Sequence, residues 1–111
     1  MTIIISSQGE SVESQPSLRF GRAPYYIEYN ISDEEWKAHK NSAVKESSGA
    51  GVAASQFIID HRPSAVISGR FGPNAQRALS SANVEMLTFD ESYETIQSVI
   101  EGYKSGQLKP F

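Results

Sequence analysis

The sequence predicts one α/β domain built around a mixed β-sheet. Three isoleucines in residues 2–6 form an apolar run between polar neighbours, which is typical of a central strand covered on both faces. From residue 51 onward, helix and strand patterns alternate, which indicates parallel strands joined by crossovers. No internal repeat or linker divides the 111 residues, and this length is near that of one domain. We therefore expect a single domain over residues 1–111.

The first half of the chain is predicted to form antiparallel strands. In residues 25–31, aromatic and β-branched side chains recur at every second position, and Pro24 precedes them where it does not interrupt a ladder. Residues 32–40 fit two structures. Ser32 and Glu35 have the spacing of a capping box and slightly favour a short helix, whereas the acidic pair between them suits a hairpin turn into another strand.

The second half contains clearer signals for where elements begin and end. Apolar residues recur at helical spacing from residue 51, and this helix should end before Pro63, because the residue preceding a proline is disfavoured in the helical region. Gly72 and Pro73 predict the start of the next helix, and Ser92 is the expected cap of the last one. The expected elements are a helix over 51–62, a strand over 65–69, a helix over 72–79, a strand over 84–89 and a helix over 92–103.

The composition argues against several classes of function. Lysine and arginine total 10 against 13 acidic residues, a formal net charge of −3, whereas general binders of nucleic acid or acidic membranes normally present a basic face. The absence of cysteine excludes disulfides, thiolate-held zinc, self-ligated iron–sulfur clusters and cysteine nucleophiles. No apolar run approaches the roughly 20 residues of a membrane helix, and no export signal is evident. We therefore expect a cytoplasmic protein.

Three glycine-containing turns are the strongest candidates for a site. They are residues 19–22 (RFGR), residues 47–51 (SSGAG) and residues 69–73 (GRFGP). The last two lead into helices, whose N-termini offer unpaired N–H groups and a partial positive charge, and ligands of α/β domains usually bind at the carboxyl ends of strands. Forked donors suited to oxyanions are supplied by Arg19, Arg22 and Arg70. These features predict an anion pocket if the turns share one edge of the sheet.

Each of these features also has a purely structural explanation. Glycine at turns and proline at helix starts serve backbone geometry in any α/β protein, and the spacing matches neither the phosphate-loop motif nor the dinucleotide fingerprint. Arginine on a surface loop is commonly a solvated charge, and Phe20 is commonly a packing residue. The residues alone therefore leave the choice between pocket and ordinary turns open.

Catalytic and metal-binding patterns are sparse. His39 and His61 are the only histidines, and each is interpreted as a surface or helix-end residue, with axial ligation of a delivered cluster as the alternative. The acidic run 33–35 is interpreted as a solvated turn, and no nucleophile elbow occurs. Asp60 and Asp90 remain as candidates for a hydrolase with a borrowed metal. An enzyme is the least favoured class.

The same turns carry a resemblance to a known family. The sequences RFGRAP at 19–24 before an aromatic strand, GAG at 49–51 opening a helix and GRFGPNA at 69–75 resemble the dinitrogenase iron–molybdenum cofactor biosynthesis family, which includes nitrogenase accessory factors. The resemblance covers nearly the whole chain. It implies a ribonuclease-H-like three-layer α/β fold with a five-stranded mixed sheet and the element order βββαβαβα. It also implies that residues 35–40 form a strand, and we adopt that expectation.

The resemblance further implies which residues face a ligand. Members of the family are associated with anionic iron–molybdenum or related metal–sulfur clusters. By motif, the cluster-side loops would be lined by Arg19, Gly21, Arg22, Gly49, Gly51, Gly69 and Gly72, and Arg70 joins them as an oxyanion donor. The sequence departs from the family pattern in having Ser42 rather than proline after Asn41. Residues 41–51 also contain no histidine or cysteine for covalent attachment of a cluster.

We therefore expect a non-catalytic accessory or carrier protein that binds an anionic metal–sulfur cluster or a molybdenum oxyanion. Its expected partners are proteins that donate or accept the cluster, with no role for nucleic acid or a membrane. The alternative is a protein-interaction or regulatory scaffold without a cofactor, whose arginine loop contacts carboxylates of a partner.

Overall fold

Six strands form one mixed sheet within residues 1–42 and 49–111, which are the residues that the computed structural model describes. The elements are β1 (Thr2–Ser7), β2 (Tyr25–Asn30), β3 (Trp36–Lys40), α1 (Ala50–His61), β4 (Ala65–Ser68), α2 (Pro73–Ser81), β5 (Glu85–Thr88), α3 (Ile96–Lys104) and β6 (Lys109–Pro110). The strand order is β3-β2-β1-β4-β5-β6. Strand β4 is parallel to both β1 and β5, and the other pairs are antiparallel. The expected mixed α/β architecture is confirmed.

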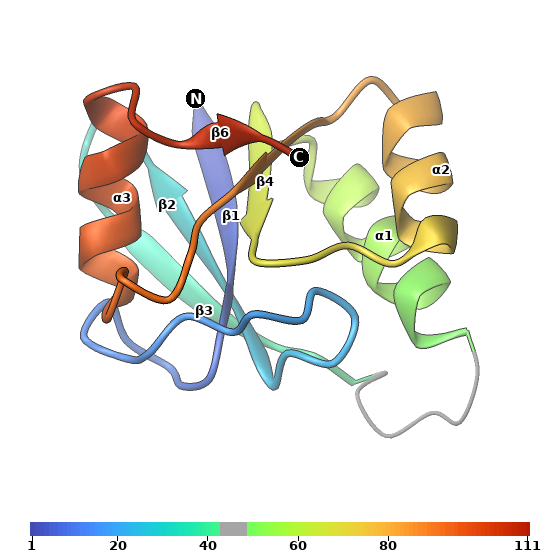
Figure 1. Ribbon diagram of the computed structural model, residues 1–111, viewed down its shortest axis with the longest axis horizontal. Coiled ribbons are helices and arrows are strands. Elements are labelled where there is room, and N and C mark those ends of the chain that lie inside the picture. Colours follow the sequence, from blue (N-terminus) through green and yellow to red (C-terminus); the bar gives the residue numbers. More distant parts are fainter. Residues whose placement is uncertain (43–48) are drawn as a thin grey trace.

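Helices cover both faces of the sheet, with α3 on one side and α1 and α2 on the other (Figure 1). The central strand β1 is buried on both faces, as its unbroken isoleucine run predicts. Ile3 and Ile5 pack in one apolar core with the buried face of α3, whereas Ile4 packs in a second core with residues of α1 and α2. The alternation of side chains along β1 therefore joins two cores through one strand.

The segment that local rules favoured as a helix is the edge strand β3. It pairs with β2 in an antiparallel register that places His39 opposite Tyr26. The polar residues before it form the connecting turn, because the Asn30 side chain accepts a hydrogen bond from Ser32 N and the Asp33 side chain accepts one from Glu35 N. The strand implied by the family resemblance is confirmed. The backbone hydrogen bonds that this segment makes with the edge of β2 outweigh its weak local preference for a helix.

Two further expectations are wrong. The sheet has six strands rather than five, because Lys109 and Pro110 pair with β5 as the short strand β6. Two exposed residues give no periodic pattern, so sequence reasoning could not find this strand. The last helix begins at Ile96 rather than near residue 92. Ser92 instead hydrogen bonds to Asp90 through its N–H and hydroxyl, which makes a turn there.

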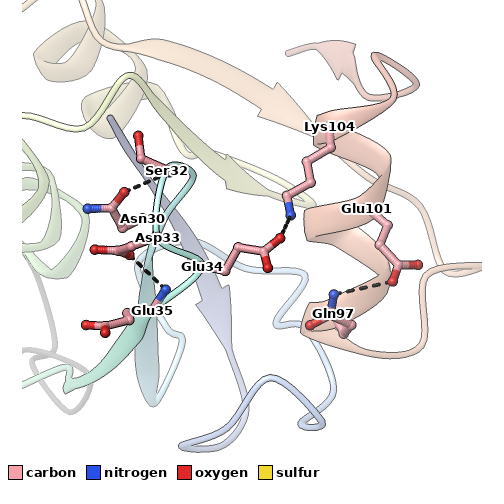
Figure 2. A network of polar contacts seen from close by, with 8 residues as sticks. All are labelled: Asn30, Ser32, Asp33, Glu34, Glu35, Gln97, Glu101 and Lys104. Atoms are coloured by element: carbon pink, nitrogen blue, oxygen red, sulfur yellow. Dashed lines mark hydrogen bonds and ion pairs between the residues drawn. The ribbon is translucent and has the colours of Figure 1, made fainter.

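Contacts at the turn between β2 and β3 connect it to α3. Figure 2 shows the Glu34 carboxylate in an ion pair with Lys104, and their charged atoms lie 2.9 Å apart. The Lys104 ammonium also lies 5.2 Å from the centre of the Tyr29 ring. These contacts connect the β2–β3 turn and the end of β2 to the last residue of α3.

The described helices are all too short or too polar to cross a bilayer. Residues 43–48 lie outside the described residues, and they include the first two residues of the SSGAG turn. The sequence-based statement that the loop 41–51 has no group to attach a cluster therefore falls partly on residues without a structural description.

Candidate functional site

The loops that follow β1 and β4 and the start of α1 meet at one end of the sheet, where the parallel strands β1 and β4 have their carboxyl ends (Figure 1). Backbone hydrogen bonding joins two of these loops, because Arg19 and Arg70 form a parallel bridge in which Phe20 N donates to Arg70 O at 3.0 Å. Below them, the buried Ser6 hydroxyl lies 2.7 Å from Ser17 O and 2.8 Å from Ser68 Oγ. The strand ends thus set the positions of the loops.

Two glycines allow these segments to approach closely. A Cβ atom at Gly21 would lie 3.2 Å from the backbone of Gly51, so the RFGR turn touches the first turn of α1. A Cβ atom at Gly69 would lie 2.9 Å from the backbone of Leu18. Gly49, the N-cap of α1, has a φ of 79°, which glycine adopts without strain.

An aromatic cluster packs around Phe20 of the RFGR turn. Phe20 is buried and its ring centre lies 5.1 Å from that of Phe71 and 5.6 Å from that of Tyr26. The Tyr26 hydroxyl donates to Phe20 O at 2.5 Å, and burial raises the pKa of this hydroxyl well above its ordinary value, so it stays a donor. The Asn41 amide donates to Ala23 O at 2.9 Å. Phe20 is therefore a packing residue, as its structural interpretation predicted.

Seven of the eight predicted site residues line one surface hollow of about 280 Å³. They are Arg19, Gly21, Arg22, Gly49, Gly51, Arg70 and Gly72. We call this cavity the glycine–arginine hollow. The helices α1 and α2 both begin at its rim, and neither has a side-chain cap or an acidic residue in its first turn. The positive ends of both helix dipoles thus border the hollow together with Arg19, Arg22 and Arg70.

Gly69 lies outside this hollow. It lines a neighbouring hollow together with Arg19, Arg70, Asp90 and Glu91. Hydrogen bonds from the Ser92 hydroxyl and N–H lower the pKa of Asp90 below its ordinary value, which keeps this carboxylate charged. The acidic pair therefore places negative charge beside Arg19 and Arg70 on the Gly69 side.

The described residues that line the glycine–arginine hollow include no imidazole, carboxylate or thiolate. The two histidines lie elsewhere, and their rings are 5.0 Å apart between centres. Sequence reasoning missed this proximity because His39 and His61 belong to different elements, β3 and α1, whose packing no local pattern specifies.

The fold and this set of donors define a small α/β protein with an arginine- and glycine-lined hollow at the carboxyl ends of its central parallel strands. The sequence profile of the family described as "Dinitrogenase iron-molybdenum cofactor" matches residues 1–106, and the chain belongs to this family. The resemblance inferred from the three turns is thereby confirmed. A comparison with curated proteins gives no match.

Solved structures of similar fold come from several organisms. The apo form of the orange protein from Desulfovibrio gigas has a TM-score of 0.90 at 22% identity, covering 99% of this chain and 92% of that one. A NifB-like protein from Thermotoga has a TM-score of 0.85 at 27% identity, covering 98% and 91%. A dinitrogenase-family protein from Methanocaldococcus jannaschii has a TM-score of 0.71 at 19% identity, covering 100% and 94%. The similarity in fold to each of these structures extends over nearly the whole of this chain.

Proposed function

We propose that the protein is a non-catalytic accessory or carrier protein that binds an anionic metal–sulfur cluster, of iron–molybdenum type, or a molybdenum oxyanion. The observation that carries this proposal is the meeting of three separate turns at the glycine–arginine hollow. Family membership supports a ligand related to the iron–molybdenum cofactor. Cytoplasmic donors and acceptors of the cluster are the partners that fit such a role.

The chemistry of the hollow suits a guest that carries several negative charges. Each guanidinium is a planar fork that reaches two acceptor atoms, and helix N-termini present N–H groups to anions. Gly21 and Gly51 both line the hollow, and their close packing brings the RFGR turn and the start of α1 to the same rim. The described residues that line the hollow offer hydrogen-bond donors and positive charge, which release a guest without breaking a metal–protein bond, as a carrier requires.

The proposal extends to the fold class and the domain. The element order β1-β2-β3-α1-β4-α2-β5-α3 follows the order expected for a ribonuclease-H-like domain, with β6 added after it. This order supports the ribonuclease-H-like assignment, and the family match over residues 1–106 supports treating the chain as one accessory-factor-like domain.

Anaerobic titration with tetrathiomolybdate, followed by visible absorbance, tests the proposed function. We expect saturable binding by the wild type and an affinity lower by about tenfold or more in Arg22→Ala, since a charge-assisted hydrogen bond contributes about 1.5–3 kcal/mol. The matched control is Arg77→Ala, which removes an equal charge from α2 outside the hollow. Equal affinities of the two variants, or no spectral change with the wild type, would contradict the proposal.

The interaction scaffold remains a second candidate because apolar side chains are exposed next to the hollow. Leu18, beside Arg19, is 43% exposed, and Val52, beside Gly51, is 50% exposed. A docking surface for a partner often combines exposed apolar residues with arginine. Anaerobic pull-down with and without thiomolybdate separates the two functions, because a scaffold captures its partner equally well in both conditions.

A further inference from the structure

A second cluster of reactive side chains lies away from the glycine–arginine hollow. Glu28 on β2, His39 on β3 and His61 at the last residue of α1 each offer one ligand atom, and these atoms all lie within 4.8 Å of one another. The chain has only two histidines, and both are in this triad. We propose that the Glu28–His39–His61 triad binds a divalent transition-metal ion, for which Zn²⁺ is the best fit. This proposal does not depend on the proposed function.

The sheet register brings the first two ligands together. β2 and β3 pair so that His39 lies opposite Tyr26 and Lys37 lies opposite Glu28. Glu28 and His39 are therefore diagonal neighbours on the same face of the sheet, within reach of each other's side chains. Glu28 Oε1 lies 2.9 Å from His39 Nε2, and the two side chains are only 19% and 25% exposed. Partial burial strengthens their attraction for a cation relative to a fully solvated pair.

The third ligand is oriented by its own helix. His61 Nδ1 lies 2.9 Å from the Phe57 carbonyl oxygen. Because a carbonyl has no proton to give, Nδ1–H must be the donor, and the neutral ring then keeps its lone pair at Nε2. Histidines that bind metals commonly have their other nitrogen fixed in this way by a backbone carbonyl.

An aromatic wall restricts the two imidazoles. The Phe57 ring centre lies 5.2 Å from that of His39 and 4.3 Å from that of His61. The histidine rings themselves meet edge to face, with their planes inclined by 62°. Packing thus holds both rings close together before any ion binds, which reduces the entropy lost on binding.

The donor set and the spacing fit zinc. Two imidazole nitrogens and one carboxylate, with water at the remaining position, form a common zinc environment, and Zn–N and Zn–O bonds of about 2.0–2.2 Å place ligand atoms about 3.4 Å apart in a tetrahedron. The three ligand atoms lie within 4.8 Å of one another, so they are already near this spacing, and small side-chain rotations can close any remaining gap. The ion replaces the proton that His39 Nε2 shares with Glu28, and this proton moves to His39 Nδ1 or to solvent. Hard ions such as Mg²⁺ prefer oxygen ligands and fit less well.

An alternative explanation is a structural cluster in which Glu28 and His39 form a cross-strand ion pair and the rings only pack. The two explanations differ in the behaviour of His61. As a ligand it contributes directly to zinc affinity, whereas as a packing residue at the helix end its removal leaves zinc affinity unchanged.

Calorimetric titration of tag-free protein with ZnCl₂ tests the proposal, and the absorbance of Co²⁺ serves as a second readout of tetrahedral coordination. We expect one equivalent of zinc to bind, with the affinity lowered at least about tenfold in both His39→Ala and His61→Ala. Asp60→Asn is the matched control, because it removes an acid next to His61 that is outside the triad, and it should bind as the wild type does.

The absence of saturable zinc binding in the wild type would overturn the proposal, as would equal affinity in the wild type and His61→Ala. Circular dichroism of each variant checks that the fold is retained. A third variant, Glu28→Gln, keeps the size and a hydrogen-bonding group and tests the carboxylate. Arg22→Ala should bind zinc normally, so failure here and failure of the proposed function are distinguishable.

Discussion

The glycines at the two ends of the Gly69–Gly72 segment have different surroundings. A Cβ atom at Gly69 would lie 2.9 Å from both the Cα and the carbonyl oxygen of Leu18, which are backbone atoms and cannot swing aside. At Gly72 a Cβ atom would meet nothing within 4 Å, and its φ of −71° is open to any residue. Gly69 is thus needed for the close approach of two loops, whereas Gly72 is not.

We predict that Gly69→Ala lowers the free energy of unfolding by about 1–3 kcal/mol, the usual cost of forcing an extra carbon into a packed site. Urea denaturation measures the change. Gly72→Ala is the control and should keep a free energy of unfolding close to that of the wild type. Equal stability of the two variants would mean that the close contact with Leu18 does not exclude a side chain at position 69.

At the scale of the element, the start of α3 shows how neighbouring polar residues compete to cap a helix. Thr95 is the N-cap, and its hydroxyl accepts a hydrogen bond from Ser98 N at 3.0 Å, while Ser98 Oγ lies 3.3 Å from Thr95 N in a reciprocal capping box. Ser92, which local rules selected, is bound to Asp90 instead. The side chain that reaches the first free N–H groups determines the boundary.

We predict that Thr95→Ala lowers the free energy of unfolding by about 1 kcal/mol, since it leaves an orphan N–H at the helix start. Ser92→Ala should have a smaller effect because it leaves the cap in place. Thermal unfolding followed by circular dichroism compares the two variants. A larger loss for Ser92→Ala would mean that the helix starts where the sequence alone suggested.

At the scale of the whole molecule, the sheet separates two apolar cores. Ile4 lies in the core with α1 and α2, and Ile100 lies in the core with α3. Both side chains are fully buried. The sheet separates the two side chains, so each packs against a different set of core residues.

We predict that Ile4→Val and Ile100→Val each cost about 0.5–1.5 kcal/mol of unfolding free energy, and that the costs add in the double variant to within about 0.5 kcal/mol. Urea denaturation of the two single variants and the double variant measures the sum. A coupling energy well above that limit would indicate that the two cores respond to each other through β1.

The sequence predicted the elements that carry strong periodicity or clear stop signals. The buried run of β1, the helix that ends before Pro63 and the helix that starts at Pro73 all agree with the structure. It could not predict β6, which is two residues long, or the start of α3, where several polar residues could act as the cap. Short segments carry too little information for a local pattern to identify them.

For the candidate site, the sequence supplied the glycine and arginine residues and a conditional expectation that their turns meet. Their ligand remains a proposal. The close grouping of seven of the residues in one hollow depends on β1 lying beside β4, a pairing between segments about sixty positions apart in the chain. No local rule contains that pairing.

The amino-acid sequence alone determined the family, the α/β class and most element positions, because these follow from hydrophobic periodicity, from glycine and proline, and from the three turn motifs. Only the tertiary structure decided that Gly69 lies outside the glycine–arginine hollow and that His39 and His61 are neighbours. Each of these depends on which distant segment packs against which, and that is set by the burial of the two cores as a whole rather than by adjacent residues.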